Sequence, residues 1–245
     1  MVPDNKKISI VMPAYNEERH IYNNILETRQ YFIDAGSLFE IIVVDDGSSD
    51  QTLSQAKMVM EKTPEVKVIS LSRNMGKGWA LREGVSHVTG DYVAFIDSDL
   101  DLHPRQLSLF FDIMQAENAD VVIGSKRHPD SKLNYPNNRK FISNGYFFLV
   151  KYLFGLPIKD TQTGLKLFKT EVIKKVFPRI LVKRYAFDLE VLAVSNHDGF
   201  KIAEAPIVLE HHLKYGRIGF KAIWETWWDT MAVFYRLKIL KYYDR

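Results

Sequence analysis

The sequence predicts an α/β protein with a mostly parallel sheet that is flanked by helices. Short apolar runs, such as 39–46 and 91–99, alternate with longer helical patterns as far as residue 126. This alternation favours parallel strands that are joined by crossover helices. Hydrophobic residues make up 46% of the 245 residues, which is enough for a sizeable core.

The predicted elements follow one another without a linker or an internal repeat. Strands rich in β-branched and aromatic residues are expected at 7–14, 39–46, 66–73, 91–99 and 119–126. Helices are expected between them, at 17–36, 48–62, 76–90 and 104–118. Later come a polar loop at 126–140, an aromatic helical stretch from Tyr146, a helix at 185–199 and a short strand at 201–212. We divide the chain into a domain of residues 1–213 and an amphipathic C-terminal helical tail of residues 214–245.

Composition excludes several classes of protein and of site. The 33 basic and 30 acidic side chains give a net charge of +3, which is too balanced to indicate nucleic acid. Without cysteine, the chain has no disulfide, thiolate nucleophile or thiolate metal site, and this fits an intracellular protein. The sequence shows neither a secretory signal nor an apolar stretch of the roughly 20 residues that cross a bilayer. We therefore expect a soluble or peripheral protein.

Three carboxylates alternate after the apolar run of 92–96, at Asp97, Asp99 and Asp101. In an extended chain, residues two apart share a side, so the three are expected to converge. Ligands of parallel sheets bind beyond the carboxyl ends of the strands, which puts Asp46 and Arg73 on the same rim. Converging like charges favour a divalent metal site, and oxygen ligands suit Mg²⁺ or Mn²⁺. A solvated turn that caps a helix is the alternative.

The glycines around Lys77 do not form a known nucleotide signature. Leu81 occupies a position where a dinucleotide fingerprint needs glycine, and Leu71 and Trp79 exclude a phosphate-binding P-loop. Gly76 is expected to form a tight turn that opens a helix. Lys77 then lies near the positive end of that helix, an arrangement that suits a diphosphate.

Four segments in this order resemble the nucleotide-sugar half of family 2 glycosyltransferases: SIVMPAYNEE, IIVVDDGSSDQT, LSRNMGKGWALREGV and FIDSDLD. Farther on, IGSKR, NNRKFISNGY, KDTQTGLKLFK and RYAFDLEVL resemble the branch of dolichyl-phosphate glucosyltransferases and mannose synthases, most nearly the former. The resemblance runs from Ile8 to Pro206. It implies a Rossmann-like GT-A fold, with residues 1–213 as the catalytic domain.

The resemblance also implies roles for the donor residues. The residues matching those that bind the nucleotide sugar are Pro13, Ala14, Tyr15, Glu17, Asp46, Lys77 and Asp97. Asp97 and Asp99 match residues that act in catalysis and, with Asp101, hold Mg²⁺ or Mn²⁺. Glutamine is common at the third of these positions in the mannose synthases, so Asp101 departs from that pattern, and its role as a ligand has weaker support than those of Asp97 and Asp99.

Arg127, Arg139 and Ser143 match residues that contact the acceptor phosphate in the mannose synthases. Guanidinium groups bind phosphate through paired hydrogen bonds, although a solvated basic loop is the alternative. Asp160 matches the region where relatives with sugar acceptors carry a catalytic base. A phosphate monoester with a second pKa of about 6 is already anionic, so we expect Asp160 to orient acceptor or sugar first and to act as a base second. Helix capping is its structural alternative.

Two acidic residues lie two positions apart on the helix predicted at 185–199. Asp188 and Glu190 are therefore expected to face different directions. We expect one to approach the active site and the other to pair with a cation.

The resemblance implies an inverting transfer of a hexose, with glucose favoured, from a nucleotide sugar to dolichyl or another polyprenyl phosphate. UDP-glucose is the expected donor and GDP-mannose the alternative. Trp224, Trp227 and Trp228 with basic flanks suit a membrane surface, while packing on the protein's own core is the rival interpretation. We expect a protein peripheral to the cytoplasmic face of a membrane, and a membrane-anchoring partner or a homo-oligomer stays open.

Two other functions compete with this one. A family 2 glycosyltransferase with a sugar or glycan hydroxyl as acceptor would need Asp160 as an obligatory base. A non-catalytic module that binds nucleotide sugars on a membrane surface would bind lipid without turnover, and the intact carboxylates argue against it. Nucleic-acid binding is the poorest alternative, because acidic residues interleave with the basic ones.

Overall fold

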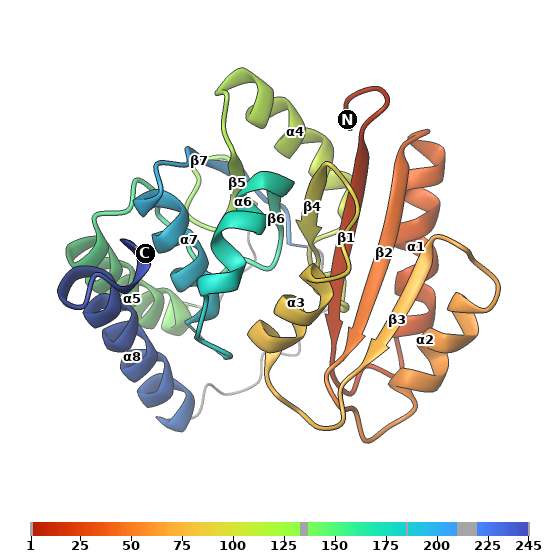
Figure 1. The fold of residues 1–245 in the computed structure, drawn as a ribbon, viewed down its shortest axis with the longest axis horizontal. Coiled ribbons are helices and arrows are strands. Elements are labelled where there is room, and N and C mark those ends of the chain that lie inside the picture. Colours follow the sequence, from red (N-terminus) through yellow and green to blue (C-terminus); the bar gives the residue numbers. More distant parts are fainter. Residues whose placement is uncertain (1, 133–136, 185, 210–219, 245) are drawn as a thin grey trace.

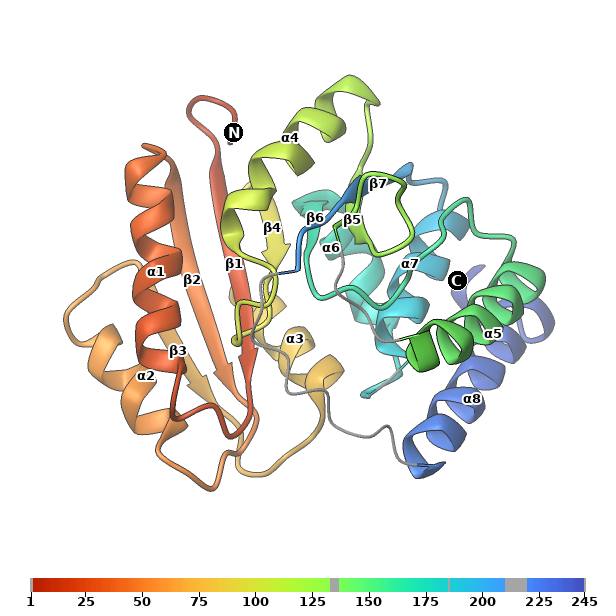
Figure 2. The same ribbon diagram turned by 180° about the vertical axis from the view of Figure 1, so that it is seen from behind.

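The computed structural model describes residues 2–132, 137–184, 186–209 and 220–244. Within the helices that begin at 137 and 220, side chains are described from 145 and 224 onward. One sheet of seven strands forms the centre, with helices on both faces (Figures 1 and 2). The predicted α/β architecture is therefore confirmed.

The sheet is mostly parallel, as predicted, with the strand order β3-β2-β1-β4-β6-β5-β7. Its strands are β1 (Lys7–Ala14), β2 (Leu38–Asp45), β3 (Val66–Ser70), β4 (Tyr92–Phe95), β5 (Val121–Ser125), β6 (Lys166–Lys169) and β7 (Ile202–Pro206). β6 runs antiparallel between β4 and β5, while the other neighbouring strands pair in parallel. The sequence analysis did not predict β6, because this four-residue strand carries the polar Lys166 at its first position.

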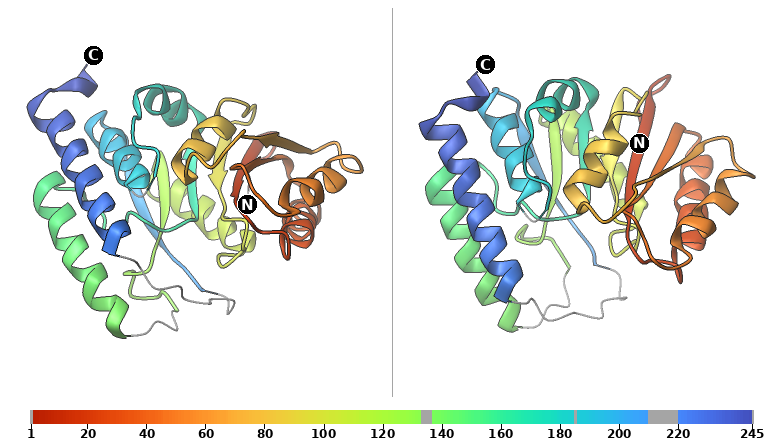
Figure 3. Two further views of the ribbon diagram at one scale, coloured as in Figure 1. Left: turned by 90° about the horizontal axis from the view of Figure 1, so that it is seen from below. Right: turned by 60° about the horizontal axis from the view of Figure 1, so that its bottom comes forward.

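Helices cover the sheet in two layers. They are α1 (Ile21–Asp34), α2 (Thr52–Met60), α3 (Lys77–Val85), α4 (Leu107–Ala116), α5 (Asn137–Phe154), α6 (Thr170–Val176), α7 (Phe187–His197) and α8 (Phe220–Phe234). α1, α2 and α4 lie on one face, and α3, α6 and α7 lie on the other. α5 and α8 run side by side outside α7 (Figure 3).

Each face of the sheet has its own apolar core. In β1, Ile8 and Ile10 belong to the core under α1 and α4, while Val11 belongs to the core under α3. Successive side chains of a strand point to opposite faces, so a strand covered on both sides reads as one continuous apolar run. This explains why the central strands were recognisable from the sequence.

The chain leaves the sheet earlier than expected before the three alternating carboxylates. β4 ends at Phe95, and the amide of Leu100 then donates to the carbonyl of Asp97 at 3.1 Å. Leu100 has a φ of +53°, which is left-handed backbone and typical of a turn. The expectation that Asp97, Asp99 and Asp101 share a side through strand alternation is therefore wrong, because they lie on a turn.

The described part of the C-terminal tail, residues 220–244, is helical, as predicted, but it is more than one regular helix, and residues 214–219 lie outside the described residues. α8 is followed by a π-helical turn at Tyr235–Ile239 and a 3₁₀ turn at Tyr242–Asp244. Val233 and Tyr243 are buried in the core beneath α3 and α7, whereas Trp224 and Trp228 are 64% and 63% exposed. The tail thus packs on the protein's own core through one face and leaves tryptophans exposed. Among the described residues, no helix combines the length and hydropathy of a membrane span.

Candidate active site

A cavity of about 320 Å³ lies beyond the carboxyl ends of β1, β2 and β4. Its lining comprises Pro13, Ala14, Tyr15, Glu17, Asp46, Asn74, Gly76, Lys77, Asp97, Ser98 and Asp99. All the residues predicted to bind the nucleotide sugar belong to this lining. They meet because the parallel strands that precede them end at the same edge of the sheet.

Asp46 organises the loop that opens α3. Its carboxylate accepts hydrogen bonds from the amides of Met75 at 2.7 Å and Gly76 at 2.8 Å. Gly47, with a φ of +67°, allows this loop to approach, because a Cβ there would lie 2.3 Å from the carbonyl carbon of Arg73. Gly76 has a φ of +97° and places Lys77 at the first position of the helix, as the sequence predicted.

Lys77 and Asp97, two residues of the cavity lining, form an ion pair. The ammonium Nζ lies 2.5 Å from Oδ1 of Asp97, and both side chains are partly exposed. Burial alone would lower the pKa of Lys77, but the charge of Asp97 raises it. Burial alone would likewise raise the pKa of Asp97, but the charge of Lys77 lowers it. Both groups are therefore held in their charged forms.

Negative charge accumulates around this pair. Desolvation raises the pKa of Glu17, and the charges of Asp99, Asp50, Asp101 and Asp97 raise it further. Desolvation and then the charge of Asp97 raise the pKa of Asp99. A cation bound here would relieve this repulsion.

The carboxylates suit a hard divalent cation. Asp97 and Asp99 line the same cavity and offer oxygen ligands, which Mg²⁺ and Mn²⁺ prefer, and such ions accept phosphate oxygens and water at their other positions. Asp99 accepts a hydrogen bond from the amide of Asp101 at 3.1 Å. No cluster of three or more potential ligands forms among the described residues, so the assignment of Asp101 stays a prediction.

The residues predicted to bind the acceptor phosphate lie on other elements than the donor cavity: Arg127 follows β5, and Arg139 and Ser143 belong to α5. The guanidinium of Arg127 lies over the ring of Phe147, 4.7 Å from its centroid, and this contact joins the two elements. Arg139 and Ser143 belong to α5, but their side chains lie outside the described residues. Their common role therefore stays a prediction.

Asp160 braces two loops and lies outside the cavity lining. Its carboxylate accepts hydrogen bonds from the amides of Lys126 and Gln162, both at 3.0 Å, and from the hydroxyl of Thr163 at 2.8 Å. These contacts hold the loop after β5 against the loop before β6. No helix follows Asp160 before β6 begins at Lys166, so the helix-capping alternative is wrong, and a role of Asp160 as base stays a prediction.

Several residues of the site were not predicted. Asn74, Gly76 and Ser98 line the cavity beside predicted residues, so their neighbours in sequence were the available signal. Gly164 packs on Asp97, because a Cβ there would lie 2.0 Å from Oδ2. No sequence signal pointed to this contact, which depends on the antiparallel β6.

Asp188 and Glu190 face different directions, as predicted for residues two apart on a helix. Asp188 accepts a hydrogen bond from the buried ammonium of Lys166 at 2.7 Å, and its charge raises the pKa of Lys77. Glu190 is fully buried and pairs with Arg236 at 2.8 Å. Both acids pair with a cation, and Asp188 is the one that approaches the active site.

Comparison with known proteins agrees with this geometry. Residues 9–177 match the family model of Glycosyl transferase family 2. The chain belongs to this family. The family 2 domain of this chain is also similar in fold to glucosyl-3-phosphoglycerate synthase from Mycobacterium tuberculosis, crystallised with Mn²⁺, UDP and glucosyl-3-phosphoglycerate. That match has a TM-score of 0.70 at 21% identity and covers 94% of this chain and 79% of the other, which confirms the predicted GT-A fold.

Curated relatives are more similar in sequence. The dolichyl-phosphate beta-glucosyltransferase of Dictyostelium discoideum is 32% identical over 220 residues, which cover 83% of this chain and 66% of that protein. The dolichyl-phosphate beta-glucosyltransferase of Mus musculus is 34% identical over 217 residues, covering 82% of this chain and 67% of that protein. The chain thus spans about two thirds of the length of these relatives.

Proposed function

We propose that this family 2 protein is an inverting glycosyltransferase that moves glucose from UDP-glucose to dolichyl phosphate or another polyprenyl phosphate. The observation that carries the proposal is the single cavity in which Asp46, Lys77, Asp97 and Asp99 meet from separate strand ends. The similarity to dolichyl-phosphate beta-glucosyltransferases supports glucose and a lipid phosphate over GDP-mannose and other acceptors. The product would be a β-linked lipid-phosphate sugar.

On this proposal, the cavity binds the donor through its nucleoside and its diphosphate. Asp46 still has lone pairs for a base N–H, because a carboxylate has about four acceptor positions and the two loop amides use two. Mg²⁺ or Mn²⁺, held by Asp97 and Asp99, would neutralise charge on the leaving diphosphate. Lys77 adds a second positive charge at the amino end of α3.

The acceptor oxygen attacks the anomeric carbon from the face opposite the diphosphate, so the configuration inverts. A phosphate monoester with a second pKa of about 6 needs no general base at neutral pH. Arg127, with Arg139 and Ser143, would bind and orient that phosphate. Asp160 then holds the surrounding loops in place, consistent with its bonds to the amides of Lys126 and Gln162.

A lipid-linked acceptor also requires contact with a membrane. Trp224 and Trp228 on α8, and Phe148 and Tyr152 on the neighbouring α5, are exposed aromatic side chains. Such residues suit the headgroup layer of a bilayer. We therefore place the protein, as part of the proposal, on the cytoplasmic face of a membrane as a peripheral protein, alone, as a homo-oligomer or with an anchoring partner.

The test is transfer from labelled UDP-glucose, UDP-N-acetylglucosamine or GDP-mannose to dolichyl phosphate in detergent, with Mg²⁺, with Mn²⁺ and with a chelator. We expect metal-dependent labelling of the lipid from UDP-glucose. Labelling from GDP-mannose alone would overturn the choice of donor. Donor binding without any turnover would instead support a non-catalytic binding module.

Asp160→Asn separates the two classes of acceptor. Asparagine keeps one of the two oxygens, so one loop amide loses its acceptor, and it cannot accept a proton. With a phosphate acceptor, only the lost hydrogen bond matters, so we expect transfer within about tenfold of wild type. A sugar or glycan hydroxyl predicts near abolition, because its proton must be removed during attack. If the wild-type protein hydrolyses UDP-glucose slowly but labels no lipid, the lipid-phosphate acceptor is wrong and a glycan acceptor is favoured.

A further inference from the structure

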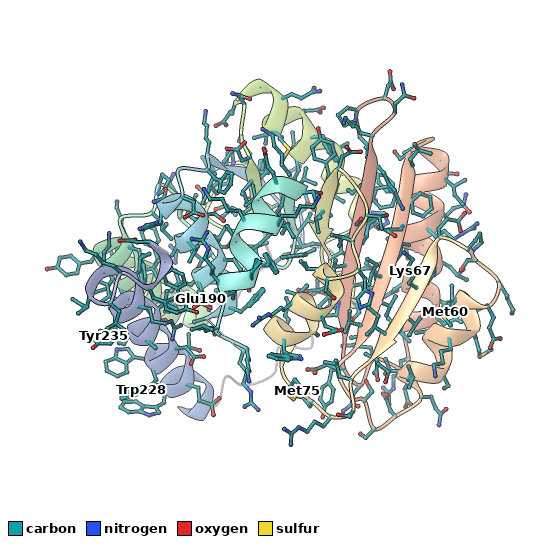
Figure 4. All side chains as sticks on the ribbon, viewed as in Figure 1. Met60, Lys67, Met75, Glu190, Trp228 and Tyr235 are labelled. Atoms are coloured by element: carbon teal, nitrogen blue, oxygen red, sulfur yellow. The ribbon has the colours of Figure 1, made fainter. Side chains whose placement is uncertain are left out.

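We propose that Glu190 is a positioning residue that couples the C-terminal segment, residues 235–244, to the amino end of α3 and so to Lys77. Glu190 lies on α7 inside the protein, between α8 and the sheet (Figure 4). The described hydrogen-bond partners of its side chain, Leu181, Val182, Arg236 and Tyr243, do not line the donor cavity. The coupling runs through a loop, residues 180–184, that contacts both regions.

The two oxygens of Glu190 bind different parts of the chain. Oε2 accepts hydrogen bonds from the amides of Leu181 at 2.9 Å and Val182 at 2.7 Å. Oε1 accepts from the guanidinium of Arg236 at 2.8 Å and from the hydroxyl of Tyr243. The carboxylate is fully buried, so each partner that it holds is held without competition from water. One buried group thus joins the loop to the C-terminal segment.

The loop in turn holds the amino end of α3. The carbonyl of Lys183 accepts from the amide of Trp79 at 3.2 Å, and the carbonyl of Ile180 accepts from Arg82 at 2.9 Å. The ammonium of Lys183 lies 4.7 Å from the centroid of the Trp79 ring. A Cβ on Gly76 would lie 2.8 Å from the carbonyl oxygen of Lys183, so the loop fits closely against the residue before Lys77.

A groove of about 1,030 Å³ separates α8 from this loop and from the loop before α3. Asn74 lines both this groove and the donor cavity, so the two spaces adjoin. Arg184 and Glu225 approach each other across the groove at 3.9 Å, but this pair is exposed and contributes little. Arg236 also lines the groove, and the buried bonds of Glu190 join it to the loop on the other wall.

A purely structural role would not require this carboxylate. Buried ion pairs are often replaceable by apolar side chains without loss of stability, whereas loss of one partner leaves the other uncompensated. Glu190 divides its oxygens between a loop of the site and the C-terminal segment, which an apolar residue would not join. Displacement of the loop would move Gly76 and Lys77, and small displacements at a reacting centre are costly in rate.

Glu190→Gln tests the coupling. The glutamine Oε1 can accept from the amides of Leu181 and Val182, but its amide nitrogen cannot accept from Arg236 or Tyr243. We expect amide hydrogen exchange in residues 75–79 and 181–184 to accelerate about tenfold, the factor that corresponds to one lost hydrogen bond to a charged group. We also expect the affinity for UDP with Mn²⁺, measured by calorimetry, to fall by about the same factor.

Glu40→Gln is the matched control. Glu40 is also a buried glutamate and accepts hydrogen bonds from Ser9, Thr89 and Lys67, but it lies on β2 away from the loop. We expect it to lower the melting temperature while exchange in residues 75–79 and the affinity for UDP with Mn²⁺ stay as in wild type. If Glu190→Gln lowers the melting temperature and likewise leaves both readouts unchanged, Glu190 is structural only and the proposal is wrong.

Arg236→Met supplies a second variant that leaves Glu190 in place. Arg236→Met should reproduce the faster exchange of residues 75–79. The double variant Glu190→Gln/Arg236→Met should exchange little faster than either single variant, because both substitutions break the same coupling. Fully additive effects would overturn the proposal. An effect of Glu190 on the rate of transfer rests on the proposed function, but amide exchange and the affinity for UDP with Mn²⁺ do not involve the acceptor. Failure of lipid labelling and failure of the coupling are therefore distinguishable.

Discussion

The amino-terminal and carboxyl-terminal parts of the sheet hold their functional residues in different ways. Around β1, β2 and β4, the polar residues follow the strands directly, and strand pairing brings them to one cavity. Around β5 and β6, Arg127 and Asp160 lie on two loops. The first loop contacts α5 through Arg127 and Phe147, and the two loops are joined by the hydrogen bond from the amide of Lys126 to Asp160. Strand register thus determines the donor side, and tertiary packing determines the acceptor side.

The largest effect on the rate of transfer is expected from a substitution that alters the donor side alone. Asp99→Asn removes one charge of the carboxylate pair, and we expect metal-dependent transfer to fall by about 1,000-fold, as for loss of several kcal/mol of charge stabilisation. The measurement is transfer from labelled UDP-glucose over a range of Mn²⁺ concentrations. Asp34→Asn, at the last residue of α1, serves as control and should leave transfer unchanged, because its described side-chain hydrogen bond comes from Gln30 one turn away. Equal loss in both variants would contradict the assignment.

A smaller effect is expected where the two sides meet. Gly164→Ala introduces a Cβ 2.0 Å from Oδ2 of Asp97, so the carboxylate or the loop before β6 must shift. We expect transfer to fall by about 100-fold, since displacement of a reacting group by about 1 Å costs that much. Gly145→Ala on α5 is the control, because its Cβ would meet nothing within 4 Å. Wild-type transfer by Gly164→Ala would show that the two sides are independent.

The next comparison separates the two faces of the C-terminal tail. Leu237 is buried, and Leu237→Ala should lower the free energy of unfolding by about 2–5 kcal/mol. The double substitution Trp224→Ser and Trp228→Ser affects exposed residues, so it should change stability little but weaken partitioning onto anionic vesicles by about tenfold. Denaturant unfolding and vesicle flotation measure these outcomes. Unchanged flotation would remove the membrane contact from the proposal.

The smallest effect concerns the acid stability of the donor side. Burial alone would raise the pKa of Glu40, but hydrogen bonds from Ser9, Lys67 and Thr89 lower it to about 2. A pKa that is lower in the folded protein stabilises it fully above the unfolded value near 4.5 and progressively less as pH falls toward 2. This contribution is at most about 3 kcal/mol. In acid titrations followed by circular dichroism, the Glu40→Gln variant should be less stable than wild type at pH 7, and its stability should change less between pH 4.5 and 2. If its stability falls with pH as steeply as that of wild type, Glu40 does not have the lowered pKa.

The sequence by itself determined the α/β class, the parallel donor side and its nucleotide-sugar residues. Continuous apolar runs identify strands covered on both faces, and parallel pairing then places the residues after them at one edge. The family motifs around Asp46, Lys77 and Asp97 lie at these strand ends, so local pattern and position agreed.

Only the tertiary structure decided the turn that carries Asp97 and Asp99, the antiparallel β6, the contact of Gly164 with Asp97 and the buried partners of Glu190. Each depends on atoms distant in sequence: Glu190 and Arg236 are 46 positions apart, and no periodic pattern records their meeting. The two aspects of the tail, a buried face and exposed tryptophans, were also indistinguishable in sequence, because an apolar helix face can equally meet a core or a membrane.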